Sequence, residues 1–142
     1  MDTKLRAIVL IDDDLSTNLY HEIILKKAGV AEKIMKFEYA KDALLYLTTK
    51  ENGAYPQPEI IFLDINMPQM NGWKFLEEYK KLDEKQTAKI VITMLTSSLN
   101  QDDKDRALAI KEVSEYISKP LKREMLIDII EKYFVTENAC CQ

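Results

Sequence analysis

The sequence predicts an α/β fold, a doubly wound five-stranded parallel sheet with five helices. Short apolar runs alternate with longer segments in which apolar residues recur at helical spacing. Three of the short runs are apolar almost throughout, which is typical of strands buried on both faces. Regular alternation of strands and helices requires right-handed crossovers, which make the strands parallel and place helices on both sides of the sheet.

Local patterns support each element in chain order. β-branched and apolar residues predict strands over 5–11, 33–37, 59–63, 89–95 and 115–118. Helical spacing predicts helices over 16–28, 42–50, 72–82, 102–113 and 123–134. In the first helix, Leu19, Ile23 and Ile24 fall on neighbouring turns, and Gly29 follows where a left-handed glycine commonly ends a helix. The last helix has the same three- and four-residue repeat, so we expect both helices to be amphipathic.

The composition indicates one self-supporting domain. A chain of 142 residues that is 46% hydrophobic can bury a core without disulfides or a structural metal. We expect a single domain over 1–135 and a flexible tail over 136–142. Both cysteines, Cys140 and Cys141, are adjacent and lie in this tail, which is typical of free thiols rather than of a disulfide framework.

Charge and hydropathy exclude two classes of partner. The net charge of −4 is a poor match for a phosphate backbone, so nucleic-acid binding is not expected. The longest apolar runs, 7–11 and 60–63, are far shorter than the roughly 20 residues that span a bilayer, so membrane insertion is not expected either. The first residues lack the apolar core of a signal peptide, and we expect a cytoplasmic protein.

Side chains that can do chemistry follow four of the five predicted strands: Asp12, Asp13 and Asp14, then Asp64, then Thr96, then Lys119. In an open parallel sheet the carboxyl ends of the strands form the ligand-binding edge. Converging carboxylates repel one another, and Mg²⁺ is a hard cation that prefers such oxygen ligands. With Lys119, a bound Mg²⁺ balances the charges of Asp12, Asp13 and Asp64, so the site could tolerate a phosphoryl group. Asp14 can instead be the N-cap of the following helix.

Four motifs carry a resemblance to a known family. They are Ile11-Asp12-Asp13-Asp14, Phe62-Leu63-Asp64-Ile65-Asn66-Met67-Pro68 with Asn71-Gly72, Leu95-Thr96-Ser97-Ser98, and Ile117-Ser118-Lys119-Pro120. In this order, each after the expected element, they are highly specific. From about Arg6 to Tyr133 the chain resembles the receiver domains of two-component response regulators, especially single-domain ones such as the bacterial chemotaxis regulator. The resemblance implies a flavodoxin-like receiver fold.

The resemblance also implies a role for each residue of the site. Asp64 would be the phospho-acceptor, and Mg²⁺ would be held by Asp12, Asp13, Asp64 and the backbone carbonyl of Asn66. Family members with a third acid use the first two to bind the metal, so Asp12 and Asp13 are assigned as ligands and Asp14 is kept as an alternative ligand. Lys119 would stabilise charge on the transferring phosphoryl group, and Thr96 would donate to it once attached.

The resemblance also implies which residues would transmit the effect of phosphorylation and set how long it lasts. Tyr116 occupies the position of the family's switch aromatic, although it can equally be an ordinary strand aromatic packed against the fourth helix. The output face would comprise the fourth helix, fifth strand and fifth helix. Asn66 and Ser98 lie where family members tune the phosphoryl lifetime, and their small side chains leave water access to the phosphorus.

The function that follows is a single-domain response regulator. It would accept a phosphoryl group from a sensor histidine kinase or a histidine phosphotransfer protein, and then change its binding to a downstream protein target. It would not be an enzyme beyond catalysing its own phosphorylation and dephosphorylation. A Mg²⁺-dependent aspartyl phosphohydrolase is the rival, but Asn66 stands where such enzymes carry a second acid, and no segment is long enough for a cap. A phosphorylation-independent scaffold would lack the acceptor, a metal acid or the lysine, and none of these is missing here.

Three features depart from these patterns or stay unassigned. Glu112 stands where a glycine commonly ends the fourth helix in the family, so that turn must close differently. The connection over 48–58 is longer than usual, and its role is open. His21 is expected to be a surface or partly buried helix residue rather than a phosphorelay histidine.

Overall fold

The computed structural model describes residues 5–65, 71–82, 91–96, 101–118 and 121–135, with positions 91–96 and 134–135 described by their backbone alone. In these residues five strands form one parallel sheet in the order β2-β1-β3-β4-β5. The strands are β1 (Leu5–Ile11), β2 (Ala31–Phe37), β3 (Ile60–Leu63), β4 (Val91–Thr96) and β5 (Val113–Ser118). The helices are α1 (Leu15–Ala28), α2 (Ala40–Leu47), α3 (Gly72–Tyr79), α4 (Gln101–Leu108) and α5 (Arg123–Ile130), which continues into the π-helical turn η2 (Glu131–Val135). The predicted fold class is confirmed.

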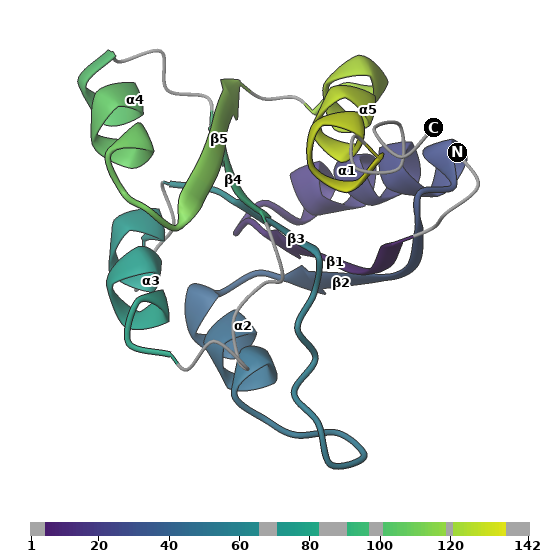
Figure 1. Cartoon of the computed structure of the whole chain (residues 1–142), viewed down its shortest axis with the longest axis horizontal. Helices are drawn as coiled ribbons and strands as arrows, with labels where there is room; N and C mark the ends of the chain where they lie inside the picture. Colours follow the sequence, from purple (N-terminus) through teal and green to yellow (C-terminus); the bar gives the residue numbers. More distant parts are fainter. Residues whose placement is uncertain (1–4, 66–70, 83–90, 97–100, 119–120, 136–142) are drawn as a thin grey trace.

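The sheet separates two hydrophobic cores, as the nearly continuous apolar strands require. Alternate residues of β1 point to opposite sides: Val9 and Ile11 join the core under α2 and α3, and Ile8 and Leu10 join the core under α1 and α5. Figure 1 shows α1 and α5 together on one side of the sheet and α2 and α3 on the other. No helix within the described residues is long and apolar enough to cross a membrane.

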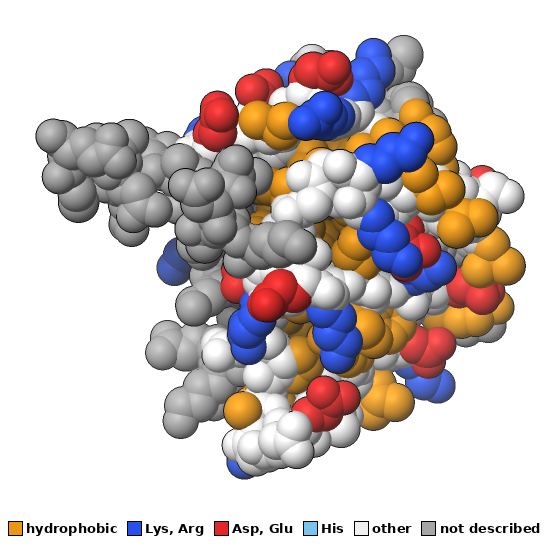
Figure 2. All heavy atoms as spheres, turned by 90° about the vertical axis from the view of Figure 1, so that its right-hand side faces the viewer, with side chains coloured by type: hydrophobic (Ala, Val, Ile, Leu, Met, Phe, Trp, Pro, Cys, Tyr) orange, Lys and Arg blue, Asp and Glu red, His pale blue; other side chains and the backbone are white. Residues whose placement is uncertain are grey.

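Helix α1 differs from the expected amphipathic pattern. It buries Asn18, His21 and Leu25, while Leu19 and Ile23 are 51% and 42% exposed. His21 is therefore not a surface or partly buried residue. Figure 2, which faces the side where α1 and α5 lie in Figure 1, shows hydrophobic side chains scattered among charged ones on the surface. The polar residues can face inward because they find backbone partners there, as described below.

The turn between α4 and β5 closes without glycine. The helix ends at Leu108 rather than at residue 113, and β5 begins at Val113. Two backbone hydrogen bonds close the connection, from the N–H of Ile110 to the carbonyl of Ala107 and from the N–H of Val113 to the carbonyl of Ile110, both 3.0 Å. Glu112 sits in the second of these turns, which needs no left-handed residue.

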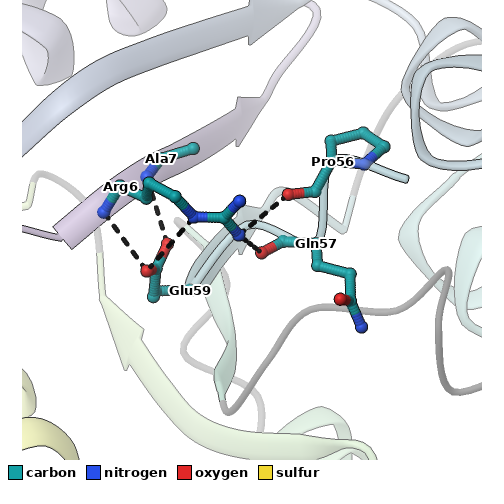
Figure 3. Close-up of polar contacts among 5 residues, drawn as sticks. All are labelled: Arg6, Ala7, Pro56, Gln57 and Glu59. Atoms are coloured by element: carbon teal, nitrogen blue, oxygen red, sulfur yellow. Dashed lines mark hydrogen bonds and ion pairs between the residues drawn. The ribbon is translucent and has the colours of Figure 1, made fainter. Parts of the chain in front are cut away.

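The long connection between α2 and β3 is fastened to the start of β1 (Figure 3). The Arg6 guanidinium donates to the carbonyls of Pro56 and Gln57 at 3.0 and 2.8 Å. The Glu59 carboxylate accepts from the backbone N–H groups of Arg6 and Ala7 at 3.2 and 3.1 Å. These contacts lie at the amino ends of the strands, the opposite edge of the sheet from Asp12 and Asp64.

Candidate acidic site at the carboxyl edge of the sheet

The structure brings Asp12, Asp13 and Asp64 together. β1 and β3 are neighbours with Ile11 paired to Leu63, so the residues that follow them emerge side by side. One carboxylate oxygen from each aspartate lies within 4.8 Å of the others. Asp12 and Asp64 are only 4% and 5% exposed, whereas Asp13 is exposed. The site is thus a largely buried carboxylate pair with a third carboxylate at its mouth.

The backbone holds these acids in register with the sheet. The N–H of Asp64 donates to the Ile11 carbonyl and the N–H of Asp12 donates to the Phe37 carbonyl, both at 3.0 Å. The Asp12 carboxylate also accepts from the backbone N–H of Asp14 at 2.9 Å. The ladder of β2, β1 and β3 therefore continues one residue beyond the strands and positions Asp12 and Asp64.

This donor set fits a hard divalent cation. Burial and mutual proximity both make negative charge costly at Asp12 and Asp64, and a bound cation offsets that cost. Mg²⁺ is commonly held by one or two carboxylates together with other oxygen atoms, and the open position of Asp13 leaves room for them. Asp12, Asp13 and Asp64 are the described side chains that could hold it.

Asp14 has a structural task instead. It is the N-cap of α1, with an extended backbone, and its carboxylate accepts from the backbone N–H of Ser16 at 3.0 Å and from the hydroxyl of Thr17 at 3.0 Å. The alternative role of Asp14 as a helix cap is the one seen in the structure.

The other expected site residues are only partly described. Asn66, Ser98, Lys119 and the tail with Cys140 and Cys141 lie outside the described residues. Thr96 is the last residue of β4 and pairs with Ser118, while its side chain lies outside the description. Tyr116 on β5 is partly buried and packs on the core that also contains Ala107 of α4. This packing fits both roles considered for Tyr116, so its role as a switch stays a prediction.

Two residues that the sequence did not mark as functional support the site from α1. The Asn18 side-chain N–H₂ donates to the carbonyl of Asp12 at 2.9 Å and to that of Phe37 at 3.3 Å. His21 Nε2 accepts from the backbone N–H of Leu121 at 3.2 Å. Asn18, His21 and Leu25 are spaced by three and four residues, so they share one face of the helix. Because Leu25 is a leucine expected in the core, its spacing to Asn18 and His21 could have indicated from the sequence that these two residues are buried.

Gly72, which belongs to one of the four motifs, also supports the site, because α3 begins directly against the backbone of Asp64. A Cβ added at Gly72 would lie 2.6 Å from the Asp64 carbonyl oxygen and 2.9 Å from the Ile65 Cα. The Gly72 N–H donates to the Ile65 carbonyl at 2.8 Å, and Asn71 caps the helix by accepting from the Lys74 N–H at 3.0 Å. The Asn71-Gly72 motif therefore has a steric reason: only glycine allows this approach.

Fold and site together define a class of protein: flavodoxin-like domains with strand order 2-1-3-4-5 and a carboxylate cluster at the carboxyl edge of the sheet. The chain belongs to the response regulator receiver domain family, whose sequence model matches residues 8–131. Receiver domains are signalling modules of two-component systems that interact with histidine kinases or phosphotransfer proteins, and phosphorylation and Mg²⁺ binding are features of the family.

Similar proteins come from distant organisms. The chain is 28% identical over 134 residues to the probable methanogenesis regulatory protein FilR2 of Methanothrix harundinacea, covering 92% of this chain and 84% of that protein. It is 30% identical over 137 residues to the hybrid signal transduction histidine kinase D of Dictyostelium discoideum, but that match covers only 8% of the kinase. A two-component response regulator from Cytophaga hutchinsonii has a similar structure, with a TM-score of 0.76, 29% identity and coverage of 92% and 97%.

Proposed function

We propose that this protein accepts a phosphoryl group on Asp64 from a sensor histidine kinase or a histidine phosphotransfer protein, and then changes its binding to a downstream protein. One observation carries the proposal: in a member of the receiver family, the buried Asp64 carboxylate lies within 4.8 Å of those of Asp12 and Asp13. A cytoplasmic location is part of the same proposal.

In the proposed reaction the Asp64 carboxylate is the nucleophile. One of its oxygens bonds to phosphorus, the bond from phosphorus to the donor's imidazole nitrogen breaks, and that nitrogen keeps the electron pair. Asp12, Asp13, Asp64 and the backbone carbonyl of Asn66 would hold Mg²⁺, which supplies positive charge to the phosphoryl oxygens. The backbone hydrogen bonds at Asp12 and Asp64 keep both carboxylates in place, so little reorganisation is needed.

The proposed signal passes from Thr96 and Lys119 to the face formed by α4, β5 and α5. The new phosphoryl oxygens would take hydrogen bonds from the Thr96 hydroxyl and the Lys119 ammonium. Thr96 and Ser118 are paired in β4 and β5, so movement at the end of β4 can reach the strand that carries Tyr116. Asn66 and Ser98 would set how long the acyl phosphate survives.

The first testable prediction concerns the acceptor itself. Wild-type protein incubated with acetyl phosphate and Mg²⁺ should gain the mass of one phosphoryl group, and Asp64→Asn should gain none, because an amide cannot form an acyl phosphate. Intact-mass spectrometry measures both. Asp42→Asn, which changes an exposed acid of α2 outside the carboxylate cluster, is the matched control and should behave as the wild type.

Two outcomes would overturn the assignment. An adduct on both wild type and Asp64→Asn would place the phosphoryl group elsewhere, and an adduct on neither would remove phosphoryl acceptance. Steady release of phosphate from simple phosphate monoesters, with many turnovers per Asp64, would favour the phosphohydrolase instead.

A further inference from the structure

A small, partly enclosed cavity lies beside the acidic site, between α1 and the ends of β1 and β3. Its volume is about 10 Å³, measured as the space open to the centre of a water molecule, which is about what a single buried water needs. The residues that line it are Leu10, Ile11, Asp12, Asn18, His21, Phe62 and Asp64. A cavity with four polar residues in its wall is a place where water, rather than empty space, is expected.

The orientation of the Asn18 amide is fixed by its surroundings. Its nitrogen faces two backbone carbonyls, those of Asp12 and Phe37, and both can only accept hydrogen bonds. Exchanging the nitrogen and oxygen of the amide would set an oxygen against both carbonyls. The nitrogen therefore belongs where it is, and Oδ1 is the polar atom that remains for the cavity.

Oδ1 of Asn18 lacks a donor within the described part of the chain. Asn18 is 2% exposed, and this oxygen is fully buried with no hydrogen-bond partner there. A buried carbonyl oxygen without a partner is costly, because it has given up its hydrogen bonds to water and gained none in return. Buried groups of this kind are commonly satisfied by an ordered water.

The neighbours in the cavity wall define what the occupant must offer. Carboxylates of Asp12 and Asp64 accept hydrogen bonds, as does Asn18 Oδ1. The occupant must therefore donate at least two hydrogen bonds and be no larger than a water molecule.

We propose that this cavity binds one water molecule, which donates one hydrogen bond to Oδ1 of Asn18 and the other to a carboxylate oxygen of Asp12 or Asp64. The water joins α1 to the acidic site, and it gives a buried carboxylate a neutral donor whether or not a cation is present. It does not depend on the proposed phosphoryl transfer, since it belongs to the unphosphorylated protein.

The first test is a crystal structure of the wild-type protein at a resolution that shows buried waters. The expected result is a peak within hydrogen-bond distance of Asn18 Oδ1 and of one carboxylate oxygen of Asp12 or Asp64, as well ordered as the surrounding side chains. An empty cavity in a map that shows other buried waters, a protein donor on Oδ1, or a cation in the cavity would each overturn the proposal.

The second test measures the water in solution. Wild type should show long-lived water-to-amide NOEs at backbone amides of the cavity residues, and Asn18→Leu should lose them, because leucine has a similar size but no acceptor. Thr17→Val, one residue away on α1 and outside the cavity wall, is the matched control and should keep them. NOEs that persist in Asn18→Leu would contradict the role of Asn18, and if that variant does not fold, the wild-type crystal structure decides alone.

Discussion

At the scale of single residues, the acidic site depends on groups that carry no charge. Gly72 lets α3 approach the backbone of Asp64, and Asn18 holds the carbonyl of Asp12. Both act on the backbone that carries a carboxylate rather than on the carboxylate itself. Substitutions at these positions should therefore change where the acids lie without changing which acids are present.

Gly72→Ala tests this dependence. The added methyl group would lie 2.6 Å from the Asp64 carbonyl oxygen, so the backbone must move. Overpacking of this kind typically costs about 1–3 kcal/mol in the free energy of unfolding. Urea denaturation measures it. Gly29→Asn is the control: Gly29 has φ +64°, a value that asparagine tolerates, and open space around it, so this change should cost far less. Equal costs for the two variants would contradict the close approach.

At the scale of elements, α1 has an unusual division of faces. Its inner face carries Asn18 and His21 beside Leu25, and its outer face carries Leu19 and Ile23. The inner polar groups bond to backbone atoms of three other segments, the ends of β1 and β2 and the start of the α5 region. Hydrogen bonds to backbone, together with Leu25, thus determine how α1 is rotated about its axis.

Alanine substitutions distinguish the two faces of α1. Leu25→Ala should lower the free energy of unfolding by about 2–5 kcal/mol, because it empties a fully buried site. Leu19→Ala should change it by no more than about 0.5 kcal/mol, since the side chain is half exposed and alanine favours helix. Urea denaturation of both variants measures the difference. A loss at Leu19 as large as that at Leu25 would show that α1 packs with its other face.

The π-helical turn η2 is joined to β5 through the side chain of Glu115. Glu115 accepts hydrogen bonds from the Lys132 ammonium at 2.8 Å and the Tyr133 hydroxyl at 2.5 Å. Partial burial by itself raises the pKa of Glu115, but the hydrogen bonds from Lys132 and Tyr133 outweigh it and leave this pKa below its usual value of 4.5. The contact fastens the end of α5 to a strand of the proposed output face.

This contact should weaken in acid. Because the pKa of Glu115 is lowered by folding, its contribution to stability is present above the usual pKa and is lost as the pH falls through the lowered one. Glu115→Gln should therefore cost up to about 1 kcal/mol near neutral pH, and less in acid, since the group is partly exposed. Urea denaturation at several pH values measures this. A cost for Glu115→Gln that does not fall in acid would refute the contact.

At the scale of the whole molecule, the sheet collects its acids from two distant parts of the chain. Asp12 and Asp64 are neighbours because the strands before them, β1 and β3, are adjacent in the sheet. No local segment of the sequence decides this strand order. The same arrangement concentrates negative charge in the folded state. A cation that binds there binds the folded protein alone and therefore stabilises it.

Mg²⁺ should raise the unfolding temperature of the wild-type protein, and a chelator should reverse the rise. At a free concentration of about 100 times the dissociation constant, the gain is about 2.7 kcal/mol. Asp13→Asn should lose much of this response while unfolding at the same or a higher temperature without metal, because one repelling charge is gone. Differential scanning calorimetry measures both, with Asp42→Asn as the control. An equal response to Mg²⁺ in wild type and Asp13→Asn would exclude Asp13 as a ligand.

Local sequence patterns were enough to predict the type and order of the elements and the strand ends at which the acids stand. Both depend on local patterns: apolar runs for strands, helical spacing for helices, and the position of Asp12 and Asp64 directly after buried strands. The sequence also allowed both readings of Asp14 and Tyr116 without choosing between them.

Three features could be seen only in the folded protein: how α1 is rotated about its axis, why residue 72 is glycine, and that Asn18 and His21 are buried. An apolar pattern indicates which side chains of one segment are expected to be buried. It does not indicate which backbone groups of other segments need a hydrogen-bond partner from that segment. The partners of Asn18 and His21 come from β1, β2 and the residue Leu121, so their burial follows from the assembled sheet rather than from the helix.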